Sequence, residues 1–89
     1  MPSPSVISPR IAQWRRAFGG HLRAQREANG FTQEALAERA GVDRKLIYRT
    51  ELGQTSPRLD AVVQIADALN VTTAQLVDPP KPRSRGRSQ

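Results

Sequence analysis

The sequence predicts an all-α fold, a compact bundle of five short helices. Apolar residues recur at spacings of three and four along the middle of the chain, and no stretch alternates apolar and polar residues as a half-buried strand does. Four of the five periodic runs are preceded by a residue type that caps helices, and glycine or proline marks the end of several of them. With 89 residues, the chain has room for one small domain.

We expect this domain to occupy residues 9–78, with its core in residues 18–77. Residues 1–8 are rich in Pro and Ser, which predicts a disordered leader. Residues 79–89, PPKPRSRGRSQ, predict a basic disordered tail. The chain has 14 Lys and Arg against 8 Asp and Glu, and four of the six excess positive charges lie in this tail. The domain itself is therefore only slightly basic.

The first helix is predicted to begin at Pro9, with Ser8 as its cap. Its apolar residues recur at helical spacing: Ile11, Trp14 and Phe18. The Asn-Gly pair at residues 29–30 is a C-terminal stop. Gly19 and Gly20 each weaken the middle by about 1 kcal/mol relative to alanine. The segment is thus either one helix or two short ones.

The second helix is capped by Thr32, covers residues 33–40 and stops at Gly41. It is rich in alanine and about two turns long, so it would not be stable alone. Its small side chains indicate close approach by another helix. The third helix is capped by Asp43 and covers residues 44–52, before a glycine.

The fourth helix begins at Pro57 or Arg58. Its apolar residues form one stripe: Leu59, Val62, Ile65, Ala66 and Leu69. A capping box of Thr72 and Gln75 predicts a fifth, very short helix that ends near Val77. The two prolines that follow end the domain.

The segment 32–52 consists of two short helices joined by a turn, which is typical of a helix-turn-helix motif. The turn, Ala-Gly-Val-Asp, contains Gly41, which adopts a positive φ without steric cost. The same pattern also occurs in other helical hairpins. The residues of the third helix therefore have to show whether this segment is a DNA-binding helix-turn-helix.

Helical spacing places the basic residues of the third helix opposite its apolar anchor. If Ile47 faces the core, Lys45 and Arg49 point the other way, with Arg44 at their flank and no acid among them. These side chains can donate to guanine O6 and N7 in the major groove. Arg44 or Lys45 can instead hold a phosphate. The alternative is a solvated basic face without a ligand.

From about Phe18 to Val77, the chain resembles the lambdoid-phage repressor/Cro type of helix-turn-helix protein, the XRE family. The match covers about two thirds of the chain and lies in LRAQREANGFTQEALAERAGVDRKLIYRTELGQTSPRLDAVVQIADALNV. The shared pattern is R-x-x-x-G-[FL]-[ST]-Q-x-x-L-A, a G-V turn, I-x-x-x-E-x-G, a proline, and I-A-x-A-L-x-V. The resemblance implies a lambda-repressor-like bundle that binds double-stranded DNA.

The resemblance also implies roles for individual residues. Arg44, Lys45 and Arg49 match positions that read bases, and Leu46 can touch a thymine methyl group. Gln33 matches a family glutamine that contacts a phosphate and braces the recognition helix.

Further residues match family positions that contact the DNA backbone or form contacts within the fold. Gln54 and Thr55 lie in a loop that offers backbone or side-chain donors to phosphate. Tyr48 departs from the family, which usually has a small residue here, often serine; its hydroxyl can donate to a phosphate, although its bulk can alter docking. Arg26 and Glu51 match a family ion pair. Helical spacing supports this pair, because Glu51 turns toward the apolar side, where a carboxylate needs a partner.

These observations predict a sequence-specific DNA-binding transcriptional regulator. One recognition helix reads few base pairs, so we expect a homodimer on an inverted-repeat operator. The candidate interface is the apolar group around the last helix: Val71, Leu76 and Val77. An alternative is an antitoxin or adaptor that binds mainly another protein, with Ile11 and Trp14 in its docking surface. The basic tail is either a solubility segment or a non-specific attraction for DNA.

Composition argues against several other classes. The chain has no cysteine and one histidine, His21, which argues against disulfides, a thiol nucleophile and a His/Cys metal site. No nucleophile stands beside a base, so we expect no enzyme, and also no cofactor and no small-molecule ligand. No apolar run approaches the roughly 20 residues of a membrane span, and no secretory signal is present. We expect a cytoplasmic protein without a membrane partner.

Overall fold

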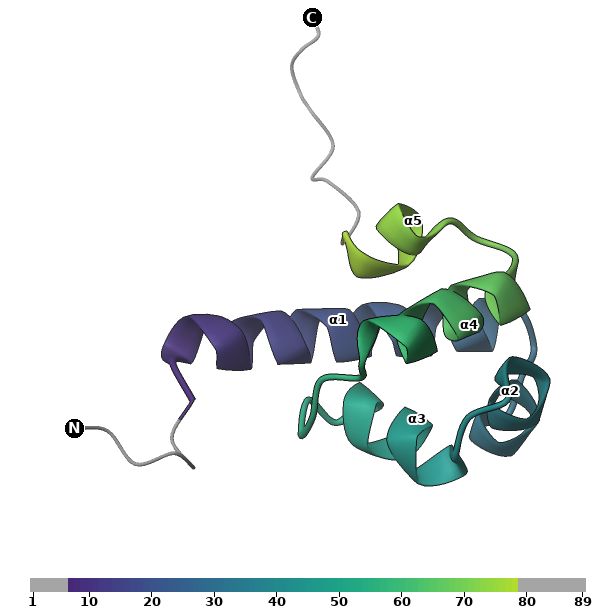
Figure 1. Ribbon diagram of the computed structural model, residues 1–89, viewed down its shortest axis with the longest axis horizontal. Helices are drawn as coiled ribbons and strands as arrows, with labels where there is room; N and C mark the ends of the chain where they lie inside the picture. Colours follow the sequence, from purple (N-terminus) through teal and green to yellow (C-terminus); the bar gives the residue numbers. More distant parts are fainter. Residues whose placement is uncertain (1–6, 79–89) are drawn as a thin grey trace, which may run out of the picture.

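The longest helix, α1 (Pro9–Ala28), is the element on which α3 and α5 pack (Figure 1). The computed structural model describes residues 7–78, so the predicted tail and most of the predicted leader lie outside the described residues. Ser8 Oγ accepts a hydrogen bond from the backbone N–H of Ile11, and Pro9 lies in the first turn. The two central glycines do not interrupt α1, which is one continuous helix.

Four short helices follow: α2 (Gln33–Ala40), α3 (Arg44–Glu51), α4 (Leu59–Leu69) and α5 (Thr73–Val77). Helix α4 begins later than predicted, because Arg58 has an extended backbone (ψ 154°) and serves as its N-cap. Helix α3 ends one residue early, with Leu52 as its C-cap. The predicted capping box of α5 is present, since Thr72 and Gln75 exchange side-chain hydrogen bonds at 2.8 and 3.0 Å. Residues 7–78 contain these helices and no strand, which confirms the all-α, five-helix fold.

All five helices contribute to one apolar core. Its largest fully buried apolar side chains are Leu22, Leu36, Ile47, Ile65, Leu69 and Leu76. Burying a side chain of this size contributes about 1.5–3 kcal/mol relative to leaving it exposed. Helix α2 packs closely on α4 through the buried Ala37 and Ala40, as its small side chains predict. Leu59, in the first turn of α4, is 70% exposed, so the predicted stripe of α4 is buried only at Val62, Ile65, Ala66 and Leu69.

Helices α1 and α3 approach closely at Gly19. A Cβ atom built on this buried glycine would overlap the carbonyl oxygen of Thr50 and lie 2.9 Å from that of Glu51. Its neighbour Gly20 is exposed, and a Cβ there meets nothing within 4 Å. The helix therefore tolerates a weak helix former at position 19 because any larger residue would push α3 away from α1.

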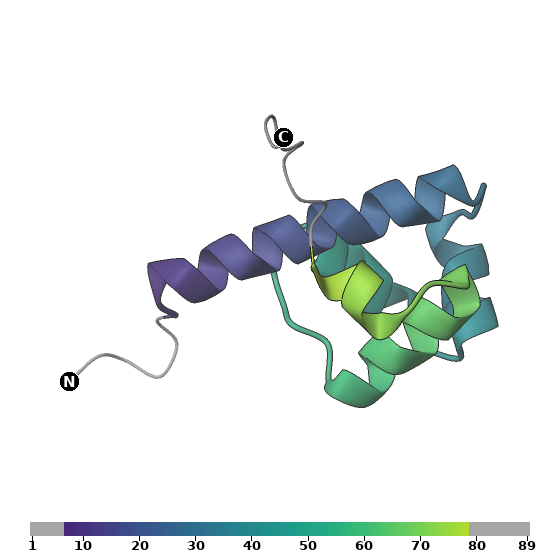
Figure 2. The same ribbon diagram turned by 90° about the horizontal axis from the view of Figure 1, so that it is seen from above.

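The N-terminal turns of α1 project beyond the other four helices, which is clearest from above (Figure 2). Ile11 and Trp14 remain 48% and 43% exposed there. Phe18, one helical step further, is partly buried and packs against the core. The apolar stripe predicted for α1 is thus continuous, but only its C-terminal part has a partner within the bundle.

We expect Gly19→Ala to lower the free energy of unfolding by about 1–3 kcal/mol, because the added methyl group overpacks the α1–α3 contact. Gly20→Ala is the matched control. It adds the same atom in the same helix without a clash, and should raise the free energy of unfolding by about 0.5–1 kcal/mol. Urea denaturation followed by circular dichroism measures both. Equal effects of the two substitutions would contradict the close contact.

Candidate nucleic-acid interface

The link between α2 and α3 is a tight turn closed by backbone and side-chain hydrogen bonds. Gly41 ends α2 with φ 74° and ψ 32°, a left-handed conformation that glycine adopts readily. The backbone N–H of Val42 then donates to the carbonyl of Ala37 at 3.0 Å. Asp43 caps α3, and its carboxylate accepts from the backbone N–H of Lys45 at 2.9 Å. These contacts set the direction in which α3 leaves the turn.

Helix α3 has one buried and one exposed side. Ile47 and Thr50 are fully buried against the bundle. The opposite side presents three exposed cations: Arg44, Lys45 and Arg49. Within residues 7–78, none of the three is engaged in an ion pair, and no acidic side chain stands among them on this helix. Their donors are therefore available to an anion or to base edges.

The other predicted contact residues surround this exposed side. Tyr48 is exposed, and Leu46 is partly buried at the edge of the face. Gln54 is exposed and Thr55 partly buried in the loop after α3. The backbone N–H of Gln54 donates to the carbonyl of Arg49 at 2.9 Å, so only the side-chain amide of Gln54 is available as a donor.

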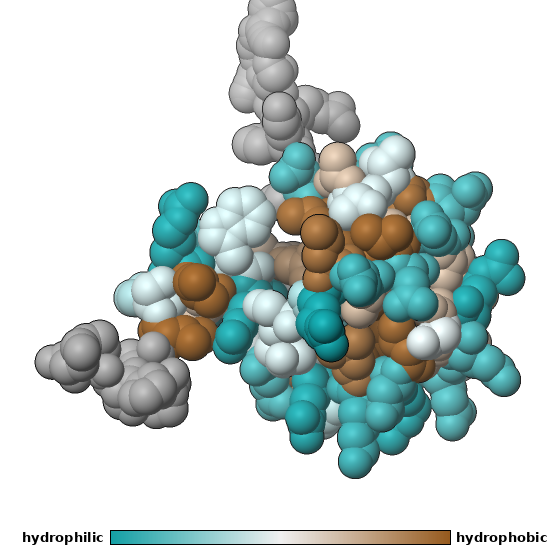
Figure 3. Space-filling view, in the orientation of Figure 1, coloured by the Kyte–Doolittle hydropathy of each residue, from teal (hydrophilic) through white to brown (hydrophobic). Residues whose placement is uncertain are grey.

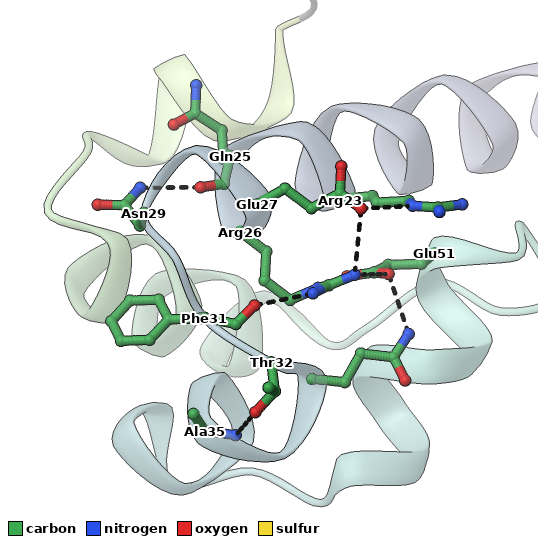
Figure 4. A network of polar contacts seen from close by, with 10 residues as sticks. Arg23, Gln25, Arg26, Glu27, Asn29, Phe31, Thr32, Ala35 and Glu51 are labelled. Atoms are coloured by element: carbon green, nitrogen blue, oxygen red, sulfur yellow. Dashed lines mark hydrogen bonds and ion pairs between the residues drawn. The ribbon is translucent and has the colours of Figure 1, made fainter.

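Arg26 and Glu51 form the ion pair that the resemblance implies (Figure 4). The guanidinium donates from Nε to Glu51 Oε2 at 2.6 Å and from Nη2 to Oε1 at 3.0 Å. Its Nη1 donates to the carbonyl of Phe31 at 2.8 Å. The two side chains are only 11% and 4% exposed. A bidentate pair with this geometry ties the C-terminal half of α1 to the end of α3 and to the segment before α2.

Gln33, at the start of α2, belongs to the same network. Its Nε2 donates to Glu51 Oε1 at 3.0 Å. The amide nitrogen has two hydrogens, so one N–H is still available as a donor. Through this hydrogen bond to Glu51, Gln33 contacts the end of α3, as the bracing role implied by the resemblance requires. Its contact with a phosphate stays a prediction.

The hydrogen bond to Glu51 raises the pKa of the Arg26 guanidinium above its ordinary value, and the attraction of the Glu51 charge acts in the same direction. Partial burial opposes this shift but does not reverse it. Arg26 consequently keeps its charge at any pH at which the protein folds.

Residues 17–78 match the model of a family described as a helix-turn-helix domain. The chain belongs to this family. Proteins of this family are DNA-binding transcriptional regulators, and the similar proteins reported next carry regulator names rather than enzyme names.

A putative HTH-type transcriptional regulatory protein of Methanocaldococcus jannaschii is 35% identical over 75 residues, which are 84% of this chain and 24% of that protein. The uncharacterized HTH-type transcriptional regulator YazB of Bacillus subtilis is 31% identical over 64 residues, 72% of this chain and 93% of YazB. The crystal structure of the restriction-modification controller protein C.AhdI from Aeromonas hydrophila has a TM-score of 0.68 and 35% identity, and covers 70% of this chain and 94% of C.AhdI. The chain thus spans about a quarter of the archaeal relative and nearly all of the other two.

For this helix-turn-helix protein, the prediction that Leu76 forms part of a dimer interface is wrong. Leu76 is fully buried, because the short helix α5 turns it into the core between α1 and α4. Val71 and Val77 are only partly buried and remain candidates for an interface. Among residues 7–78, no helix has the length and apolar character to span a membrane, and no three His, Cys, Asp or Glu side chains gather as a metal site would require.

Sequence reasoning missed two contacts that hold α3 and the loop after it. One is the approach at Gly19, which it treated as a weakness of the helix. The other is a hydrogen bond of 3.1 Å from Arg15 Nε to Ser56 Oγ, which joins α1 to the loop before α4. A glycine in the middle of an otherwise regular helix was the available signal for the first. Nothing in the spacing indicates the second, because the partners lie 41 residues apart.

We expect Glu51→Ala to lower the free energy of unfolding by about 3–5 kcal/mol, because it leaves the Arg26 charge nearly buried without its partner. Glu27→Ala is the control, since Glu27 pairs with Arg23 at 3.1 Å but both side chains are more than half exposed. Its effect should stay within about 1 kcal/mol. Urea denaturation measures both, and a small loss for Glu51→Ala would contradict the role given to this ion pair.

Proposed function

We propose that this helix-turn-helix protein is a sequence-specific regulator of transcription that places α3 in the major groove of double-stranded DNA. The observation that carries the proposal is the exposed side of α3, with three cations and no acid among them within the helix, on a helix whose other side is buried. A major groove about 12 Å wide admits a helix of this kind. The motif's second helix is the one that enters the groove in such proteins.

The contacts divide into base readout and backbone positioning. Arg44, Lys45 and Arg49 are proposed to donate to base edges, with Leu46 against a thymine methyl group. Gln33, Tyr48, Gln54 and Thr55 are proposed to hold phosphates on either side of α3. The free N–H of Gln33 supports this, because the same amide is already oriented by Glu51. A phosphate donor on a braced side chain loses little freedom on binding.

We further propose that the protein acts as a homodimer on an inverted repeat. A single recognition helix reads too few base pairs to select one site in a genome, and twofold symmetry doubles the site. The partly buried Val71 and Val77, on either side of the buried Leu76, are the proposed contacts beside α5. C.AhdI, a restriction-modification controller, is similar over nearly its whole length, which supports a role as a small regulator.

Arg49→Ala should remove about 1–3 kcal/mol of discrimination at one base position, because a single side chain reads that position. Selection of bound duplexes from random DNA defines the site. Fluorescence anisotropy then gives the affinity of each single-base variant of that site. Gln33→Ala should instead weaken binding to all variants alike. Arg23→Ala removes the same charge from α1, outside the motif, and should leave the base preference unchanged.

The decisive experiment is the combined replacement of Arg44, Lys45 and Arg49 by alanine. These side chains are exposed, so the fold should survive, as circular dichroism can verify. If the affinity for the selected site then stayed unchanged, α3 would not be the recognition helix.

Sedimentation velocity tests the dimer. We expect two chains on each selected duplex, and we expect Val71→Lys to weaken this assembly because it buries a charge in the proposed interface. Val63→Lys is the control, since Val63 is an exposed apolar residue of α4 outside that surface. A monomer both free and on the selected duplex would refute the homodimer.

A further inference from the structure

An apolar groove lies along the N-terminal half of α1, away from the residues proposed to contact DNA. It has a volume of about 510 Å³, and Figure 3 shows the hollow between the surface over α1 and that over α4 and α5. Its apolar lining comes from four parts of the fold: Ile11, Trp14, Phe18, Pro57, Val62 and Val77. None of the exposed residues of α3 lines it. Of its lining residues, only Val77 has a role in the proposed regulator function, as a candidate contact of the homodimer.

The α1 side of the groove has the spacing of a helix-packing surface. Ile11, Trp14 and Phe18 follow one another at three and four residues, the spacing at which one helix meets another. Ile11 and Trp14 are about half exposed, although both have large apolar side chains. Pro57 and Val62 form the facing wall, and the hydrogen bond between Arg15 and Ser56 holds the two walls together.

The charge around the groove is of one sign. The charged side chains that line it are Arg10 and Arg15. Residues 1–26 contain five arginines and no Asp or Glu, so the whole helical arm is cationic. An occupant that brings carboxylates to this rim gains favourable electrostatic interactions, and one that brings cations meets repulsion.

This charge pattern argues against two possible occupants of the groove, the same patch of a second copy and residues 79–89 of this chain. In a twofold contact the same patch of both copies is used, so Arg10 and Arg15 of each copy would gather in one interface with no acid on the arm to balance them. Residues 79–89 carry four cations and no acid, and would meet the same repulsion. The groove therefore suits a segment from a different protein.

We propose that this groove binds an acidic amphipathic helix of a partner protein, with the apolar side of that helix against Ile11, Trp14 and Phe18 and its carboxylates beside Arg10 and Arg15. An apolar face laid into an apolar groove is a common mode of peptide recognition. Because the groove shares no residue with the exposed side of α3, such a partner can bind while α3 is on DNA. The proposal goes beyond DNA binding and does not depend on it.

Trp14 is the single tryptophan of the chain, so its fluorescence reports directly on the groove. The probe is a synthetic helical peptide of about four turns, with leucines on one face, glutamates on the other and no tryptophan. Adding it to the full-length protein should shift Trp14 emission to shorter wavelength in a saturable manner. The same peptide with lysine for glutamate, and a scrambled peptide of equal composition, should bind at least about tenfold more weakly.

A matched pair of variants locates the binding. Arg10→Glu reverses a rim charge and should weaken binding of the glutamate peptide by about three- to tenfold. Arg23→Glu makes the same change on the same helix, outside the groove, and should leave the affinity within about twofold. Within residues 7–78 Arg10 makes no ion pair, and Arg23→Glu breaks only the exposed pair with Glu27, so circular dichroism should show both variants folded.

Three results would overturn the proposal. The first is no shift of Trp14 emission with the glutamate peptide. The second is equal binding of the lysine or scrambled peptide. The third is a shift of Trp14 emission with the concentration of the Val71→Lys variant alone, because that variant weakens the proposed dimer contact and a second copy would then occupy the groove itself. DNA binding by the same samples is measured separately, so failure here leaves the recognition helix untouched.

Discussion

The bidentate contact between Arg26 and Glu51 is the constraint on which the arrangement of α3 depends. It joins the end of α1 to the end of α3, and through the Phe31 carbonyl and Gln33 it also includes the start of α2. A planar guanidinium that donates to two oxygens of one carboxylate fixes orientation as well as distance. Because both side chains are nearly buried, water does not compete strongly for these bonds.

The same end of α3 is held from a second direction by Gly19. The backbone of α3 lies directly on this glycine, so the helices touch without an intervening side chain. The start of α3 is positioned independently, by the Asp43 cap and by the buried Ile47. Contacts at both ends leave α3 little freedom to tilt, which suits the role proposed for its exposed side chains, since contacts with base edges need a fixed register.

The bundle divides its surface into parts with different chemistry. The side formed by α3 and the start of α2 carries the candidate nucleic-acid donors, together with the exposed side chains of Tyr48 and Leu52. The N-terminal arm of α1 is cationic as well, but it borders an apolar groove with half-exposed large side chains. An exposed apolar patch of this kind marks an interaction site.

The sequence by itself determined the helices and the exposed side of α3, because both follow from local rules. Caps such as Ser8, Thr32 and Thr72 act within three residues, and helical spacing alone separates Ile47 from Lys45 and Arg49. The pairing of Arg26 with Glu51 came from the resemblance to the XRE family, and helical spacing added that an acid on the apolar side needs a counter-charge. Only the tertiary structure decided that Gly19 is a contact, that Leu76 is buried and that Leu59 is not. These three features depend on how the helices pack against one another, and contacts between residues far apart in the chain determine that packing.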